Sequence, residues 1–334
     1  MSAPTPPTAE LHLHVEGTIE AELLVRLADR DGLPLPSRDP AVLRERYEHF
    51  ADLQAFLDVY YANLAVLRTE EDFHELATGY LDRARAAGVR RAEVFFDPQT
   101  HVGRGVPLEA VIRGLSSAFA AAEETHGVSA ALILCFLRDL GPEAAEEILR
   151  AALPLREHFI GVGLDSAEVG YPPSLFTRVY AMAASEGLHR VAHAGEEGGP
   201  DYVREALDLL HVARVDHGIR AMEDPELVAR LRAERIPLTV CPLSNVYLRA
   251  VDALPDHPLP RMLDQGLVAT VNSDDPAYFG GYVDENYRAV ARDLGLDRAR
   301  LAQLARNSVD AAFAPAEDKR RWHGEIAEWT ARAG

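Results

Sequence analysis

Two histidines stand two residues apart in the run "ELHLHVEGT", residues 10–18. If this run is a β-strand, His12 and His14 point to the same face, because side chains alternate across a strand. Two imidazoles on one face can share a divalent ion, since imidazole is a common ligand of Zn²⁺ and similar cations. The run therefore predicts one half of a metal site.

Four later apolar runs also end in histidine or acidic residues, at 165–168, 193–196, 216–218 and 273–275. In a parallel barrel the carboxyl ends of the strands converge on one mouth, where active sites lie. Buried charges are unfavourable unless they are paired or bind a metal. His193 and Asp274 could complete a metal shell with the two histidines. Glu196, His217 and Asp275 would then remain as acid–base groups.

Such a site predicts metal-assisted hydrolysis. A bound divalent ion lowers the pKa of water from about 16 to about 7, which makes the water a nucleophile at neutral pH. The sequence has no G-x-S-x-G elbow for a serine nucleophile. The glycine-rich run "HAGEEGGP" lacks the lysine of a phosphate-binding loop. We therefore expect one Zn²⁺ per chain, with Fe²⁺ also compatible with these ligands.

The positions of these residues depend on the elements that carry them. Eight aliphatic or β-branched runs alternate with helical patterns, which predicts a parallel sheet. Eight strands favour a closed (β/α)8 TIM barrel, with a doubly wound open sheet as the competing architecture. The predicted strands span residues 9–17, 89–98, 129–139, 159–168, 188–196, 213–219, 236–245 and 267–276.

One connection is longer than a minimal barrel needs. Residues 18–88 lie between the first two predicted strands and carry aromatic-rich helical patterns. Extra helices over strand ends often act as lids, so we predict a lid here. Residues 1–8 are predicted to be a disordered tail, and residues 9–334 one barrel domain.

Charge and cysteine usage limit the possible partners. The formal net charge is −19, whereas a nucleic-acid ligand needs a basic surface, so no nucleic-acid partner is expected. No apolar run approaches the roughly 20 residues of a membrane span. Cys135 and Cys241 lie in apolar runs, and unpaired buried thiols are typical of a reducing cytoplasm. The sequence does not determine the oligomeric state.

The motifs "ELHLHVEGT", "HAGEEGG", "RVDHGIR", "CPLSN" and "NSDDPAYF" resemble the ordered motif set of the adenosine/adenine deaminases, in the amidohydrolase superfamily. The resemblance runs from about residue 9 to residue 285. It implies a (β/α)8 fold, one Zn²⁺ and hydrolytic removal of the 6-amino group of a purine. It also implies these roles: His12, His14, His193 and Asp274 as metal ligands, Glu196 as proton donor to purine N1, His217 as the group that orients and deprotonates the water, and Asp275 as partner of the water or of purine N7.

Three departures from the adenosine-specific pattern favour a free base as substrate. Adenosine deaminases carry aspartate where this chain has Glu16, and glycine near the position of Glu168. The run "FFDPQTH", 95–101, resembles the adenine deaminase subgroup. Two longer carboxylates would narrow the ribose region, and one could accept a hydrogen bond from the N9–H of adenine. The prediction is conversion of adenine to hypoxanthine in purine salvage, with Glu16, Gly17 and Glu168 as substrate-binding residues beside Asp275.

Other functions stay open at this point. They are deamination of adenosine or another 6-aminopurine nucleoside, including an aminofutalosine-type substrate, hydrolysis of an N6-substituted adenine, and a catalytically silent barrel that binds a purine. An intact Glu196 argues against the silent barrel, because a binding protein needs no proton donor at N1. Asp165 and Ser166 are predicted to support the site indirectly, whereas Asp216, His101 and His257 receive no functional role.

Overall fold

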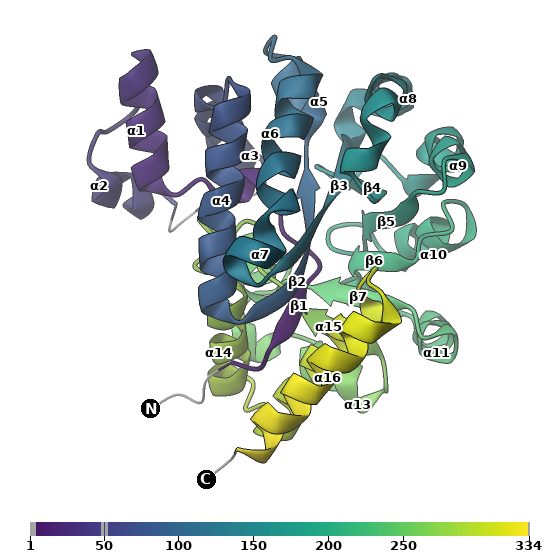
Figure 1. Ribbon diagram of the computed structural model, residues 1–334. Helices are drawn as coiled ribbons and strands as arrows, with labels where there is room; N and C mark the ends of the chain where they lie inside the picture. Colours follow the sequence, from purple (N-terminus) through teal and green to yellow (C-terminus); the bar gives the residue numbers. More distant parts are fainter. Residues whose placement is uncertain (1–4, 48–49, 51–52, 333–334) are drawn as a thin grey trace.

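The computed structural model describes residues 5–47, 50 and 53–332, and it forms an α/β barrel (Figure 1). Eight strands follow one another around the sheet in sequence order, and every hydrogen-bonded pair along it is parallel. This order confirms the predicted (β/α)8 barrel, because a doubly wound sheet would change direction within the strand order. The strands are β1 (Thr8–Glu10), β2 (Val89–Phe96), β3 (Ser129–Leu137), β4 (Gly161–Asp165), β5 (His189–Ala194), β6 (Arg214–His217), β7 (Pro237–Val240) and β8 (Val268–Val271).

The barrel closes just beyond the ends of β8 and β1. Leu13 and Asp274 form an isolated parallel bridge. The backbone N–H of His14 donates to the carbonyl of Asp274 at 3.0 Å, and that of Asp274 donates to the carbonyl of His12 at 3.1 Å. The same hydrogen bonds that close the barrel therefore set three predicted metal ligands side by side. The first strand is shorter than predicted, since Glu16–Thr18 forms a 3-10 turn, η1.

Helices cover the outside of the barrel, and both chain termini lie on the same side of the molecule (Figure 1). The helices are α1 (Ala21–Asp31), α2 (Pro40–Glu45), α3 (Leu53–Asn63), α4 (Glu70–Ala87), α5 (Pro98–Val102), α6 (Leu108–Ala120), α7 (Ala122–His126), α8 (Gly141–Ala152), α9 (Thr177–Ser185), α10 (Pro200–Asp208), α11 (Pro225–Glu234), α12 (Pro242–Tyr247), α13 (Leu259–Asp264), α14 (Val283–Asp293), α15 (Arg298–Ala311) and α16 (Ala316–Ala331). None of the helices in the described ranges is both long and apolar enough to cross a membrane.

Capping residues at the two ends of α4 explain where this helix begins and where strand β2 follows it. Thr69 and Asp72 form a capping box at the start of α4, in which each side chain accepts the backbone N–H of the other. Gly88 ends the helix with a φ of 84°, a left-handed conformation that glycine adopts without strain. Strand β2 begins at the next residue, so the long connection delivers β2 directly beside β1.

The segment between β1 and β2 contains the predicted extra helices α1, α2 and α3. Whether they open and close as a lid stays a prediction. At the amino terminus, residues 1–4 of the predicted tail lie outside the described residues. The prediction of a tail that extends to residue 8 is wrong for Thr8. This residue belongs to β1, and its hydroxyl lies 2.9 Å from Ser308 Oγ.

Candidate active site

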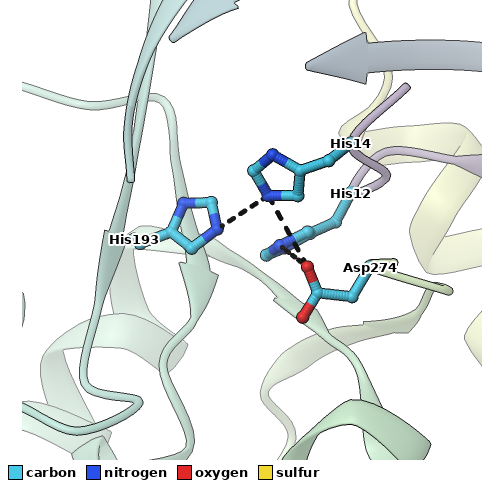
Figure 2. Close-up of side chains that lie close together, drawn as sticks. All are labelled: His12, His14, His193 and Asp274. Atoms are coloured by element: carbon cyan, nitrogen blue, oxygen red, sulfur yellow. Dashed lines mark hydrogen bonds and ion pairs between the residues drawn. The ribbon is translucent and has the colours of Figure 1, made fainter. Parts of the chain in front are cut away.

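The four predicted metal ligands converge at the carboxyl ends of the strands (Figure 2). His14 Nε2 lies 3.3 Å from His193 Nε2 and 3.6 Å from Asp274 Oδ1. His12 Nε2 lies 3.4 Å from the same oxygen of Asp274. All four residues are buried. The structure thus brings together His12 and Asp274, which are separated by 262 positions in the sequence.

These residues fit a divalent cation. Metal–nitrogen bonds of about 2.1 Å in a tetrahedron imply ligand–ligand edges of about 3.4 Å, close to the spacings above. His12 Nε2 is buried and has no hydrogen-bond partner among the described residues. Burial and the neighbouring imidazoles, His12 first, lower the pKa of His193 well below its usual value, so His193 is a neutral ligand. Burial opposes ionisation of Asp274, but the histidines around it hold its pKa well below the usual value.

Asp216 supports two of the predicted metal ligands, although no local sequence pattern indicates a role for it. Thr239 Oγ1 donates to Asp216 Oδ1 at 2.8 Å and lies 3.0 Å from His12 Nδ1. Asp216 Oδ2 lies 3.8 Å from His193 Nδ1. Contacts of this kind orient the imidazole of a metal ligand and fix which nitrogen faces the ion.

The "CPLSN" motif contributes two more residues whose roles sequence reasoning missed. Ser244 Oγ donates to Asp274 Oδ2 at 2.6 Å. Asn245 Nδ2 donates to Glu196 Oε1 at 3.3 Å and lies 3.2 Å from His217 Nδ1. Helix α12 begins at Pro242 and places both side chains inside the site. The motif therefore positions one predicted metal ligand and two of the three predicted acid–base residues.

The predicted acid–base groups have strongly perturbed protonation. Burial and the charge of Asp274 raise the pKa of Glu196 well above its usual value, which favours the protonated carboxyl. Burial and the same neighbour raise the pKa of Asp275 in the same direction. Burial and the neighbouring His12 lower the pKa of His217 to about 3, which leaves a neutral imidazole. The directions of these shifts fit the predicted roles of Glu196 as an acid and His217 as a base.

Three residues of this region adopt a left-handed backbone although none is glycine. The φ angles are 69° at Ser166, 60° at His217 and 66° at Asp274. Such conformations cost on the order of 1–3 kcal/mol each and occur preferentially at functional sites. Here they turn the chain sharply at the ends of β4, β6 and β8, where side chains must face the mouth.

The predicted substrate contact of Glu168 needs correction. Its carboxylate accepts hydrogen bonds from the four consecutive backbone N–H groups of residues 195–198, at 2.5–3.1 Å. Glu168 is not among the described residues that line the cavity of the site. Because all its accepting capacity is used by the loop after β5, Glu168 holds Glu196 in place and is not available to a substrate.

Glu16 is not among the described residues that line the cavity, and one of its two carboxylate oxygens is bound by protein donors while Oε2 has no partner among the described residues. Its Oε1 accepts from the backbone N–H of Asp97 at 3.0 Å and lies 2.9 Å from His101 Nε2. The predicted substrate contact of Gly17 is replaced by a packing role, because a β-carbon there would lie 2.1 Å from Asp275 Oδ1. Glycine at position 17 therefore makes room for the carboxylate of Asp275.

A small cavity of about 60 Å³ opens beside the metal-ligand cluster. Helix α3 contributes one wall, which shows that the extra segment before β2 helps to enclose the site. The described residues that line the cavity are His14, Phe56, Leu57, Tyr60, Tyr61, Asp97, Leu137, Asp165, Ser166, His193, Glu196, His217, Leu248, Asp274 and Asp275.

Replacing Glu168 with glutamine is expected to destabilise the protein. Glutamine keeps the size of the side chain, but its NH₂ group would face backbone donors that now meet an oxygen. Leaving buried donors unpaired costs about 1–3 kcal/mol, so we expect calorimetry to show a Tm lower by roughly 1–4 °C for a chain of this length. Glu226→Gln, an exposed change in α11, is the control. An unchanged Tm for Glu168→Gln would contradict the structural role.

The fold and the site together define a metal-dependent barrel hydrolase of the amidohydrolase type. The family model described as adenosine deaminase matches residues 7–329, and the chain therefore belongs to the adenosine deaminase family.

Several relatives are similar over nearly the whole chain. An adenine deaminase of Streptomyces coelicolor is 60% identical over 94% of this chain and 92% of its own length. An adenine deaminase of Rhodospirillum rubrum is 57% identical over 96% of each chain. The crystal structure of an adenine deaminase from Arthrobacter aurescens aligns with a TM-score of 0.96 at 55% identity, covering 98% of this chain and 99% of that one. A Burkholderia ambifaria amidohydrolase with bound Zn aligns with a TM-score of 0.90 at 31% identity, covering 98% and 91%.

Proposed function

We propose that this protein is a hydrolytic deaminase that converts adenine and water to hypoxanthine and ammonia, a reaction of purine salvage. The observation that carries the proposal is the position of Glu196, a largely enclosed side chain on the wall of the cavity whose Oε2 lies 3.3 Å from His217 Nε2 and whose pKa is raised by desolvation and by the charge of Asp274. A protonated carboxyl next to a neutral base is suited to acid–base catalysis on a neutral heterocycle. The adenine deaminase relatives at 55–60% identity support adenine as the substrate.

The metal-ligand cluster is proposed to hold one divalent ion. His12, His14, His193 and Asp274 offer three imidazoles and a carboxylate, a donor set suited to Zn²⁺ and also compatible with Fe²⁺. The bound Zn of the Burkholderia ambifaria structure supports zinc as the first choice. When bound, such an ion supplies Lewis acidity that makes water nucleophilic at neutral pH.

Each acid–base residue is proposed to handle one proton. Glu196 donates its proton to N1, which makes C6 of the purine electrophilic. His217 orients the attacking water and accepts a proton from it as the C6–O bond forms. The C6–N bond then breaks, and the amine leaves as ammonia after gaining a proton. Asp275, protonated in its buried position, donates a hydrogen bond to N7.

The choice of adenine is tested by a kinetic panel. We expect kcat/KM for adenine to exceed that for adenosine by at least ~10³, because a polar site built for an N–H donor rejects an analogue that lacks it. The panel includes 2′-deoxyadenosine and N6-methyladenine, with ammonia release as the readout. Equal rates for adenine and adenosine would make the enzyme an adenosine deaminase. Absence of ammonia from every compound, with metal bound, would indicate a purine-binding barrel.

A further inference from the structure

Two buried acids line the cavity without a role in the mechanism above. Asp97 follows β2 and is 3% exposed, and Asp165 ends β4 and is 2% exposed. Within the described part of the chain, Asp97 Oδ1 and both carboxylate oxygens of Asp165 have no hydrogen-bond partner. Buried polar atoms are nearly always paired, so unpaired oxygens on a cavity wall point to a ligand that supplies donors.

The barrel order places these acids relative to a bound purine. Glu196 follows β5 and Asp275 follows β8, so N1 and N7 of the purine face these two strand ends. C6 lies between N1 and N7 and faces the metal-ligand cluster and His217. The opposite edge, which carries N3 and N9, then faces the remaining arc from β2 to β4. Asp97 and Asp165 lie at the two ends of this arc.

The two acids are close to one another and lie beyond the metal ligands. One ligand atom each from Asp97, Asp165 and His14 lies within 4.8 Å of the others. Asp165 Oδ2 is 3.5 Å from His14 Nδ1, whereas His14 Nε2 faces the metal-ligand cluster. The acids are therefore separated from that cluster by the ring of His14.

We infer that Asp97 and Asp165 form the subsite that recognises the five-membered-ring edge of a free purine base, with a carboxylate oxygen accepting the hydrogen bond of N9–H. This inference rests on the proposed function and transfers to these acids the selectivity that the sequence predicted for Glu16 and Glu168. A substituent on N9 removes the donor and places carbon against buried carboxylates. A buried polar oxygen that loses its hydrogen-bond partner is unfavourable, so the subsite selects against nucleosides.

The surrounding residues hold the subsite in position. Glu16 Oε1 accepts the backbone N–H of Asp97 at 3.0 Å, and His101 Nε2 lies 2.9 Å from the same oxygen. The side chain of Asp97 makes no capping hydrogen bond to helix α5, which begins at the next residue. Oδ1 of Asp97 is therefore available to a ligand, and replacing the residue removes no helix cap.

The test compares adenine with 9-methyladenine, which lacks only the N9–H donor. We expect the unaltered protein to favour adenine by at least ~10³ in kcat/KM, and Asp97→Ala to reduce this ratio to about tenfold or less. Turnover of adenine should fall while that of 9-methyladenine is kept or rises, because the shorter side chain makes room for the methyl group. Asp97→Asn keeps the volume of the side chain and should give an intermediate ratio of kcat/KM for adenine to kcat/KM for 9-methyladenine. It replaces Asp97→Ala as the test variant if Asp97→Ala does not fold.

Asp72→Ala is the matched control, since it removes another buried aspartate from the start of α4, outside the cavity. Its ratio of adenine to 9-methyladenine should equal that of the unaltered protein. A ratio unchanged in both Asp97 variants would overturn this inference and leave the proposed function intact. A second metal ion per chain that is lost in Asp97→Ala would also overturn it, by making the acids a cation site. Failure of the unaltered protein to turn over adenine would instead reject the proposed function itself.

Discussion

Glu196→Gln is expected to lower kcat for adenine by roughly 10²–10⁴, the usual contribution of general acid catalysis. Glutamine keeps the shape of the side chain and can still contact Asn245, but it has no acidic proton for N1. An interaction made only in the transition state lowers kcat with little change in ground-state binding. We therefore expect KM to stay within a few-fold of the value for the unaltered protein.

The pH profile gives a second readout of the same residue. Because burial and Asp274 raise the pKa of Glu196, the active protonated form persists at neutral pH, and activity should fall as the pH rises through that raised pKa. Glu197→Gln, a change at the adjacent residue that does not line the described cavity, is the control. Metal content should be the same in all three proteins. Near-normal turnover by Glu196→Gln would show that the proton comes from another group.

Removing the divalent ion with a strong chelator is expected to lower activity by at least ~10³, because Lewis-acid stabilisation is worth several kcal/mol and about 1.4 kcal/mol corresponds to tenfold. Adding back Zn²⁺ should restore activity, and elemental analysis should find about one ion per chain. The Tm should also fall on removal, since an ion that binds only the folded state stabilises it. Full activity in the metal-free protein would refute the metal assignment.

The metal ligands can be tested individually within one strand. His193→Ala, at the carboxyl end of β5, should lose the ion and the activity together. His189→Ala, at the amino end of the same strand, is the matched control, because His189 stacks on Phe313 away from the cluster. The control should keep its metal content and most of its turnover. Equal metal content in both variants would place the ion elsewhere.

Some parts of this protein follow from the order of residues along the chain. The spacing of His12 and His14 predicts that both side chains share a face, because side chains alternate along an extended chain, although β1 itself ends at Glu10. Eight short aliphatic runs separated by helical patterns determine a parallel barrel, and in such a barrel the strand ends must converge. The four metal ligands and the acid–base residues could be proposed from these rules together with the motif resemblance. The structure brings all of them to one place.

The partners of these residues could not be predicted, because they depend on contacts between distant segments. Nothing near Glu168 in the sequence indicates that its carboxylate accepts four backbone N–H groups of the loop after β5. His257 lies 3.2 Å from Asn245 Oδ1, a contact made by the packing after β7. A carboxylate or imidazole near a strand end has the same local pattern whether it faces a substrate or a backbone amide.

The tertiary structure alone decided which acids face the cavity. Glu16 and Asp97 are both buried acids next to the mouth, and the sharp turn after the first strand directs Glu16 to protein donors. Asp97, directly after β2, and Asp165, at the end of β4, keep unpaired oxygens on the cavity wall. Side-chain direction beyond a strand end depends on backbone angles such as the left-handed φ of Ser166, and no local sequence pattern specifies those angles for a residue other than glycine.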